Sequence, residues 1–240
     1  MTALFISDLH LDKDRPQIIA YFKNLIDNLD PNVESLYILG DFVEFWVGDD
    51  DPADGLTDVF DSIKKKSKEH SIYFMHGNRD FMITKDFCKK SGMILLDDPT
   101  IIKLGDKKIL LMHGDTLCTD DHEYQKFRTM VRSPSWQSEM LKKSLDERIS
   151  LAKMYRAKSL SETNAKNEII MDVNQQEVIN TIKKYNVDMI IHGHTHRPNI
   201  HKINIADKVY KRVVLGDWYD KRFVLNITDD KLIIDKGHII

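Results

Sequence analysis

The sequence predicts a layered α/β fold that carries one helical insertion, and three observations support this prediction. Short apolar runs rich in β-branched residues alternate with segments of helical spacing along the front of the chain. A long middle stretch has helical spacing but almost no strand signal. Closely spaced runs near the C-terminus are typical of sequential antiparallel strands. Alternating strands and helices are typical of layered α/β proteins.

Apolar runs bounded by Gly, Asp or Asn predict buried strands. In chain order these runs are Ala3–Ser7, Leu36–Leu39, Ile72–Met75, Ile109–Met112 and Met189–Ile191. Ile18–Leu29 and Leu56–Lys66, which lie between the first three runs, have helical spacing. Further strands are predicted at Val209–Leu215, Phe223–Ile227 and Leu232–Asp235.

The helical insertion is predicted from Asp120 to about Tyr185. Leu141, Leu145 and Ile149 recur within it at four-residue spacing. The chain contains no internal repeat and no low-complexity linker. We therefore expect one domain over residues 1–240, with a helical cap inserted at about 120–185.

Composition and charge exclude several classes of protein. The chain has 240 residues, of which 42% are hydrophobic and 30% are charged, as in soluble globular domains. Its net charge of -3 argues against a protein that coats nucleic acid, so no nucleic-acid partner is expected. Cys88 and Cys118 lack CxxC spacing, which predicts free thiols and a reducing cytoplasm. No leader-like segment or membrane-spanning stretch is recognisable, which leaves peripheral membrane contact open.

Potential metal ligands follow five of the predicted strands, at the point where each strand ends. These residues are Asp8, His10, Asp41, Asn78, His113, His194 and His196. Ligands bind α/β sheets in the crevice outside the carboxyl ends of the strands. Taken singly, each residue is as compatible with a structural role, in a turn or a hydrogen bond, as with metal binding. Together they predict a metal site on one rim of the fold.

The types of donor indicate which metals the site would hold. A mixed set of carboxylate, amide and imidazole donors suits a pair of first-row divalent cations. Two such cations about 3.5–4 Å apart need a bridging carboxylate. Asp41, which follows Gly40 in a turn, is predicted to be this bridge, and Asn78 to supply a neutral oxygen. The glycines at positions 40, 77, 114 and 193 are expected to let the backbone approach the cations.

The ordered motifs DLH, GDFVEFW, GNRDF, HGD and GHTHRP resemble those of the calcineurin-like metallophosphoesterase superfamily. The resemblance spans the chain and is strongest to the branch of UDP-2,3-diacylglucosamine pyrophosphatases of lipid A biosynthesis. It implies two packed mixed β-sheets flanked by helices. It further implies hydrolysis of the substrate's pyrophosphate bond by metal-activated water, giving UMP and 2,3-diacylglucosamine 1-phosphate (lipid X).

The resemblance also implies how the ligands divide between two divalent ions, which are typically manganese in this branch. The first ion would be held by Asp8, His10, Asp41 and His196. The second would be held by Asp41, Asn78, His113 and His194. The resemblance also implies that Asn78 and His194 contact substrate.

Arg79 stands where many members of the superfamily have a histidine that serves as an acid. A guanidinium group is permanently charged and can donate paired hydrogen bonds to phosphate oxygens, so Arg79 is expected to bind the diphosphate. A departing phosphate needs less help from an acid than an alkoxide does. The catalytic set is therefore Asp41, Asn78, Arg79 and His194. The alternative for Arg79 is an ion pair with Asp80.

The cap has a composition that suits a ligand with anionic and apolar parts. From Asp120 to Lys166 it contains 10 Lys and Arg against 7 Asp and Glu, interleaved with large apolar residues. The alternative is an amphipathic surface that only packs on the domain. The resemblance favours an acyl-chain site and implies further substrate contacts at Asp121, Ser159, Thr163 and Lys166.

The expected partner is a nucleotide-sugar lipid. The expected location is the cytoplasm, with peripheral contact at the cytoplasmic face of a bacterial inner membrane. Two classes of alternative stay open: another metallophosphoesterase, such as a phosphodiesterase or a nucleoside polyphosphate hydrolase, and a scaffold of this fold that has lost catalysis. The sequence predicts no oligomeric state.

Overall fold

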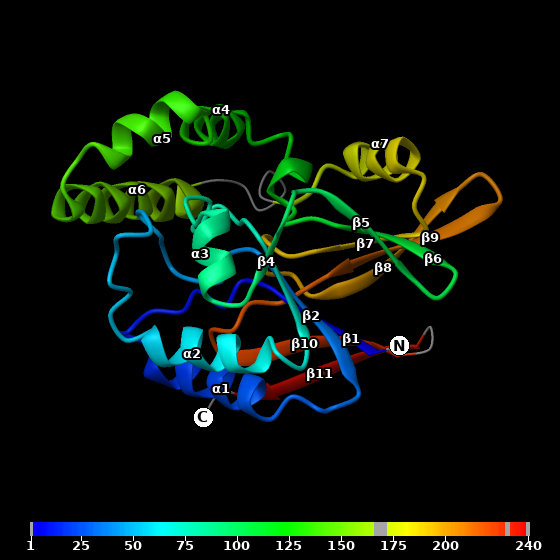
Figure 1. The fold of residues 1–240 in the computed structure, drawn as a ribbon. Coiled ribbons are helices and arrows are strands. Elements are labelled where there is room, and N and C mark those ends of the chain that lie inside the picture. The colour runs from blue at the N-terminus through cyan, green and yellow to red at the C-terminus, as the bar shows by residue number, and fades with distance from the viewer. Residues whose placement is uncertain (1, 166–171, 229–230, 239–240) are drawn as a thin grey trace.

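Two mixed β-sheets packed face to face form the centre of the molecule, and helices cover their outer sides (Figure 1). The computed structural model describes residues 2–165, 172–228 and 231–238, and side chains in the first range through residue 159. The predicted layered α/β fold with two packed mixed sheets is confirmed.

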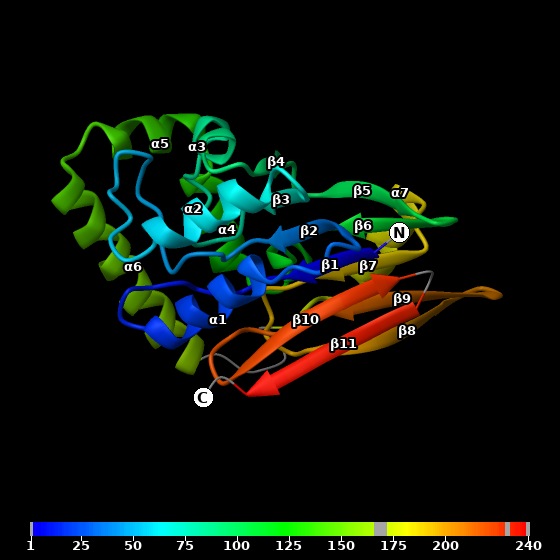
Figure 2. The ribbon, with the colours of Figure 1, turned by 60° about the horizontal axis from the view of Figure 1, so that its bottom comes forward.

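The first sheet has six strands in the order β11-β10-β1-β2-β3-β4. Their bounds are β1 Thr2–Ile6, β2 Val33–Leu39, β3 Ser71–Met75, β4 Ile94–Leu96, β10 Lys221–Thr228 and β11 Lys231–His238. Strands β1 to β4 are parallel, whereas β10 pairs antiparallel with β1 and with β11 (Figure 2). The carboxyl ends of β1, β2 and β3 therefore lie on one edge.

The second sheet has five strands in the order β5-β6-β7-β9-β8. Their bounds are β5 Thr100–Leu104, β6 Lys107–Leu111, β7 Met189–His192, β8 Asn199–Ile205 and β9 Lys208–Val214. Strands β6, β7 and β9 are parallel, and the two edge strands β5 and β8 run antiparallel to their neighbours. The loops after β6 and β7 contact the loops after β1 and β2, so both sheets contribute to one rim.

Both faces of the first sheet are buried, which explains why its central strands are continuous apolar runs. Ala3 and Phe5 of β1 point into the layer between the two sheets. Leu4 and Ile6 point to the opposite side, into the layer beneath the outer helices. A third apolar layer lies on the outer face of the second sheet.

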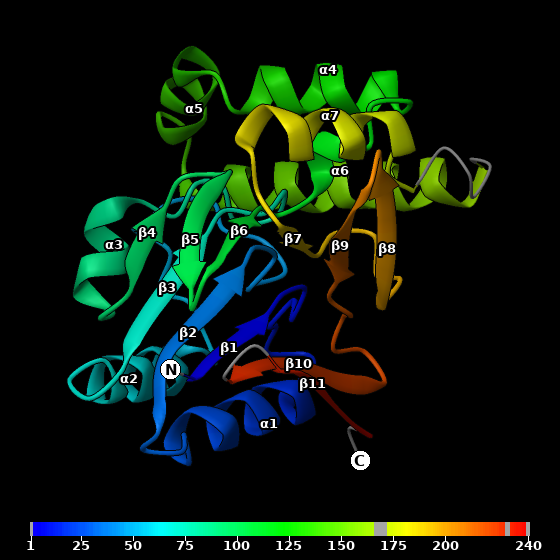
Figure 3. The ribbon, with the colours of Figure 1, turned by 90° about the vertical axis from the view of Figure 1, so that its right-hand side faces the viewer.

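The helices are placed by their apolar faces. Their bounds are α1 Pro16–Asp27, α2 Thr57–Lys66, α3 Lys85–Lys90, α4 His122–Val131, α5 Pro134–Leu141, α6 Leu145–Ala165 and α7 Gln175–Tyr185, with a 3-10 turn at Asp115–Leu117. α1 begins with Pro16 in its first turn and buries Ile18 and Phe22 against the first sheet. α7 buries Val178 and Ile182 against the second sheet (Figure 3).

The cap consists of α4, α5 and α6, which stand to one side of the sheets (Figure 1). The helical segment predicted from Asp120 to about Tyr185 also contains α7, but α7 packs on the second sheet and is not part of this group. The predicted repeat of Leu141 and Leu145 does not run along one helix, because α5 ends at Leu141 and α6 begins at Leu145.

The C-terminal strands differ from the predicted sequential antiparallel series. β9 belongs to the second sheet and β10 to the first, so the chain crosses between sheets after Val214. Among β8 to β11, the β8-β9 and β10-β11 pairs are antiparallel hairpins. The β10-β11 hairpin is the part of the prediction that holds, whereas β8 was not predicted as a strand.

Within the described ranges, none of the helices combines the length and the apolar character needed to cross a bilayer.

Candidate metal centre

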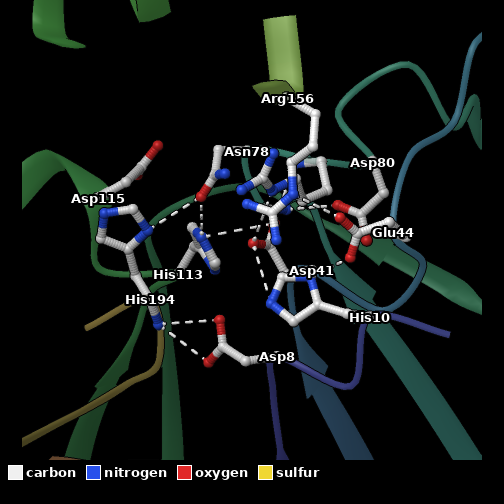
Figure 4. Close-up of polar contacts among 12 residues, drawn as sticks. Asp8, His10, Asp41, Glu44, Asn78, Asp80, His113, Asp115, Arg156 and His194 are labelled. Atoms are coloured by element: carbon white, nitrogen blue, oxygen red, sulfur yellow. Dashed lines mark hydrogen bonds and ion pairs between the residues drawn. The ribbon is translucent and has the colours of Figure 1, made fainter. Parts of the chain in front are cut away.

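All seven predicted ligand residues meet at the rim where the carboxyl ends of the parallel strands converge (Figure 4). Asp8 and His10 follow β1, and Asp41 follows β2. The others come from the loops after β3, β6 and β7: Asn78, His113, His194 and His196.

One group of donors is formed by Asp8, His10 and His196, whose ligand atoms all lie within 4.8 Å of one another. His196 Nε2 is 3.4 Å from Asp8 Oδ1 and 3.4 Å from His10 Nε2. Asp8 is completely buried and His10 is almost so.

A second group is formed by Asp8, Asp41 and His113, again within 4.8 Å. Asn78 joins this group, because its Oδ1 lies 3.0 Å from His113 Nε2 and 2.9 Å from His194 Nδ1. An amide oxygen and two imidazole nitrogens therefore face one small volume.

Asp41 lies between the two groups. Its Oδ2 is 3.8 Å from His10 Nε2 and its Oδ1 is 3.7 Å from His113 Nε2, so each oxygen faces a different group. This is the arrangement that a bridging carboxylate requires. The carboxylate of Asp8 is also common to both groups.

The donor chemistry fits divalent cations. Two carboxylates and several imidazole nitrogens are buried side by side, and uncompensated burial of such groups is costly. Oxygen and imidazole donors of this kind suit first-row divalent ions. The seven residues therefore have the composition and the convergence of a two-cation site.

The backbone at the rim is unusual. Five ligand residues have positive φ angles, namely Asp8 (55°), His10 (48°), Asp41 (51°), His194 (68°) and His196 (54°). This left-handed region is sparsely populated by residues other than glycine, and such strain gathers at functional sites. Backbone hydrogen bonds between loops hold the conformation, including Asp8 N to Gly40 O at 3.0 Å and His10 N to Asp41 O at 2.9 Å.

Gly40 shows why glycine is needed next to the bridge. Its φ is 87°, and a Cβ atom there would lie 2.5 Å from His113 Nδ1 and 2.6 Å from Gly77 N. The sequence predicted that such glycines bring backbone close to the cations. In the structure Gly40 brings the ligand-bearing loops close to one another, and its approach to the cations stays a prediction.

The buried carboxylates attract positive charge. Burial lowers the pKa of His196, but Asp8 and Asp217 outweigh this effect and raise it to about 11. Burial likewise lowers the pKa of His113, and Asp41, Asp115 and Asp8 raise it to about 9. Positive charge, whether carried by a proton or by a cation, is thus favoured at this point of the rim.

His194 behaves differently from these two histidines. Burial is the largest influence on it and His113 the next, and together they lower its pKa to about 3. The imidazole of His194 is therefore neutral at physiological pH, as a metal ligand must be.

Arg79 lies beside Asp41. Its Nε is 4.0 Å from Asp41 Oδ2, and its backbone N–H donates to Asp41 Oδ1 at 2.9 Å. Asp80 instead accepts from the backbone N–H groups of Gly77 and Phe42, each at 2.7 Å. The alternative of an Arg79–Asp80 ion pair is therefore not what the structure shows.

The predicted cap contacts are less well defined. Asp121 caps α4, because its Oδ1 accepts from Tyr124 N at 3.2 Å. Ser159 is exposed on α6. Thr163 lies in α6 but its side chain is outside the described part, and Lys166 lies outside the described residues altogether.

Three charged residues near the ligands were not singled out from the sequence. Asp115 is completely buried and accepts from Tyr124 Oη at 2.8 Å and Arg128 Nε at 2.6 Å. Glu44 and Arg156 form an ion pair beside His10 (Figure 4). Asp115 and Glu44 belong to the motifs HGD and GDFVEFW, so these motifs could have indicated both residues. Arg156 has no comparable local pattern.

The chain is similar to a known family of phosphoesterases. The profile of the calcineurin-like phosphoesterase family matches residues 1–198. A protein of Marinobacter nauticus named UDP-2,3-diacylglucosamine hydrolase is 46% identical over 91% of this chain and 90% of its own length. Proteins of the same name from Proteus mirabilis and Chromohalobacter salexigens are 43% and 42% identical, covering 97% and 96% of this chain and 97% and 94% of their own.

Proposed function

The chain belongs to the calcineurin-like phosphoesterase family, and from this premise we propose that it hydrolyses the pyrophosphate bond of UDP-2,3-diacylglucosamine. The products are UMP and 2,3-diacylglucosamine 1-phosphate, an intermediate of lipid A biosynthesis. The names of relatives that align along nearly their whole length support the substrate.

The observation that carries this proposal is the position of Arg79 next to the candidate bridge Asp41. A permanently charged group stands at the rim of a cation site, where a diphosphate would bring several anionic oxygens. Arg79 Nε is buried and has no hydrogen-bond partner within the described part of the chain. The guanidinium is therefore available to bind a phosphate oxygen.

The ligand residues hold two divalent cations in this proposal, divided as the resemblance implies. When bound, such cations lower the pKa of water and polarise a phosphoryl oxygen. Asp41 would be a ligand common to both ions, and Asn78 would supply a neutral oxygen to the second. Manganese is our choice of ion, because the donor set suits first-row metals.

The protein's own groups then act on the diphosphate. Arg79 neutralises charge on the phosphoryl oxygens, and this charge grows as the bond to the leaving phosphate breaks. His194 Nδ1 lies 2.9 Å from Asn78 Oδ1, which only accepts, so Nδ1 of the neutral ring donates to this oxygen when no ion is bound. If both atoms bound the second ion, the proton of the ring would stand on Nε2, from which it could be donated to substrate. No residue is needed to protonate the leaving group, because each half of the diphosphate departs as a stable phosphate anion.

The cap selects the lipid part of the substrate. Met130, Leu141 and Met154 of the cap are 45%, 49% and 54% exposed, so the cap has apolar surface to offer. Asp121, Ser159, Thr163 and Lys166 are the substrate contacts of the cap in this proposal, on the ground of the resemblance alone. Because the substrate carries two acyl chains, the enzyme works in the cytoplasm at the inner face of the membrane, as a peripheral protein.

The proposal is tested by the substrate range of the purified protein with Mn²⁺. UDP-2,3-diacylglucosamine should be hydrolysed to UMP, and UDP-glucosamine should be a very poor substrate. Each buried methylene of an acyl chain contributes about 0.8 kcal/mol of binding energy. Equal kcat/KM on both substrates would refute the lipid specificity. Preference for cyclic nucleotides, ATP or diadenosine polyphosphates would favour another phosphoesterase, and absence of any hydrolysis would favour a scaffold.

A further inference from the structure

We infer that Glu44 is a positioning residue that orients the imidazole of His10 through Nδ1, and that Arg156 holds this carboxylate from the cap. Glu44 follows Asp41 in the loop after β2, and its side chain is 14% exposed. The inference rests on the proposed metal centre and is independent of the proposed lipid substrate.

The first step is the direction of the His10 ring. Its Nε2 faces the ligand cluster, 3.4 Å from His196 Nε2 and 3.8 Å from Asp41 Oδ2. A neutral imidazole that offers Nε2 as a ligand carries its proton on Nδ1. His10 Nδ1 is buried and has no hydrogen-bond partner among the described residues. Its nearby carboxylate oxygen is Glu44 Oε2, at 3.5 Å.

Two other histidines of the site, His113 and His196, show the same construction. His113 Nδ1 lies 2.9 Å from Leu39 O, and because a carbonyl only accepts, Nδ1 carries the proton. His196 Nδ1 lies 3.0 Å from Asp217 Oδ2. An acceptor behind each ring fixes the tautomer and leaves the other nitrogen for the ligand cluster. Glu44 occupies the corresponding place behind His10.

The Glu44 carboxylate is itself held from two sides. Arg15 Nη2 contacts Oε2 at 2.9 Å, and Arg156 Nε contacts Oε1 at 2.7 Å. Figure 4 shows Arg156 reaching from the cap helix toward Glu44 and His10. Tyr219 completes the surroundings, since its ring stacks on that of His10 with centroids 5.5 Å apart.

The two groups of donors differ in the kind of acceptor that lies behind their histidine rings. In the group of Asp8, His10 and His196, both histidines have a carboxylate behind the ring. His113, in the other group, has a backbone carbonyl there. Loss of the Glu44 carboxylate should therefore weaken one cation site and leave the other nearly unchanged.

The test is calorimetric titration of metal-free protein with Mn²⁺, comparing the wild type with Glu44→Ala. The wild type should bind two ions. In Glu44→Ala one of the two affinities should fall by about 10–100-fold, as is usual when the partner of a ligand histidine is lost. Asp217→Ala should weaken the same site. Glu139→Ala, whose carboxylate is 69% exposed on α5, is the control and should match the wild type.

Two further variants keep the test decisive. Glu44→Gln retains the shape and an oxygen that accepts from His10 Nδ1, so it should recover part of the lost affinity even if Glu44→Ala folds poorly. Arg156→Ala should weaken the same site by a smaller factor, because Arg15 still holds the carboxylate.

The inference is overturned if folded Glu44→Ala binds both ions as tightly as the wild type. It is also overturned if both sites weaken equally, since that would mean general loosening of the rim. Failure of the wild type to bind Mn²⁺ would overturn the metal centre and this inference together. Failure to hydrolyse the lipid substrate while two ions bind would count against the proposed substrate alone.

Discussion

The rim of the sheets and the helical cap hold their side chains in place by different means. At the rim, the ligands sit on short loops between buried strands, and backbone hydrogen bonds with left-handed residues set their directions. The cap is joined to the rest of the protein by long polar side chains, four of them arginines, together with apolar contacts. Its apolar contact with the main core includes Met140, which is 5% exposed.

The arginines of the cap each contact a loop of the rim or its neighbourhood. Arg128 Nε lies 2.6 Å from Asp115 Oδ2, and Arg132 Nη2 donates to Gly77 O at 2.9 Å. Arg148 Nη1 lies 2.8 Å from Asp50 Oδ1. Arg156 pairs with Glu44. The rim is preorganised by its backbone, whereas the cap is attached by long side chains. We therefore expect mutations to affect chemistry and substrate selection separately.

The largest effect is expected at the rim, from Asp41→Ala. Removing the candidate bridge should cost several kcal/mol of transition-state stabilisation, which is about a thousandfold or more in turnover. At least one metal ion per chain should also be lost. Elemental analysis together with UMP release measures both. A folded variant with two metal ions and a normal rate would contradict the role of Asp41.

Arg79→Ala should have the next largest effect. Loss of one charged group that stabilises the transition state lowers kcat by about 10²–10³-fold. Because the diphosphate is common to both substrates, kcat/KM should fall by a similar factor for UDP-2,3-diacylglucosamine and UDP-glucosamine. Metal content should stay at the wild-type level. A loss confined to the acylated substrate would instead place Arg79 in lipid recognition.

Arg148→Ala probes the cap. In contrast to Arg79→Ala, it should affect the acylated substrate much more than UDP-glucosamine. Arg148 is 2% exposed and donates to Val47 O and to Asp50, so its loss should loosen the start of α6. A hydrogen bond to a charged group contributes about 1.5–3 kcal/mol, and we expect about a tenfold fall in kcat/KM for the acylated substrate. UDP-glucosamine hydrolysis and Mn²⁺ affinity should change little.

Lys142→Ala is the matched control for this cap variant, because Lys142 is exposed and its ion pair in the described part of the chain is with Glu139 of the cap. Limited proteolysis should reveal faster cleavage in the cap of Arg148→Ala but not of Lys142→Ala. An equal loss on both substrates would mean that the cap and the chemistry are not separable.

Replacing the two cysteines should have the smallest effect on hydrolysis, and it serves as a control for the variants of the rim and of the cap. Burial raises the pKa of Cys88 and of Cys118 to about 12. At pH 8 only about one thiol in 10⁴ is therefore ionised, and alkylation of the native protein should be slow and speed up about tenfold per pH unit. Replacing both by Ser should leave hydrolysis largely unchanged. Lost activity in a folded double variant would reveal a thiol role.

The sequence predicted central strands better than edge strands. The strands that it did not identify, β4, β5 and β8, all lie at a sheet edge. An edge strand has a partner on one side only and is less buried, so its apolar run is often short, as in the three residues of β4. β8, for example, alternates exposed and half-buried residues over Asn199–Ile205. β11 was found because its hairpin with β10 made a recognisable pair.

The candidate site was predictable to the extent that strand ends mark it. Asp8, Asp41 and His113 follow apolar runs, and the parallel order of the strands brings them together. Glu44 and Arg156 could not be paired from the sequence, because they are more than a hundred positions apart and meet only where α6 passes over the rim. Such contacts depend on the placement of the cap, which no local pattern encodes.

The left-handed backbone at the ligands limits how this site could be transplanted. Copying seven side chains onto another scaffold would move the donors but not the turns that aim them. At Asp41, a residue such as Asn tolerates the same φ, whereas a β-branched residue would disturb the loop as well as remove the ligand. A graft would therefore have to carry each strand end together with its glycine turn, so the smallest portable unit is the rim itself.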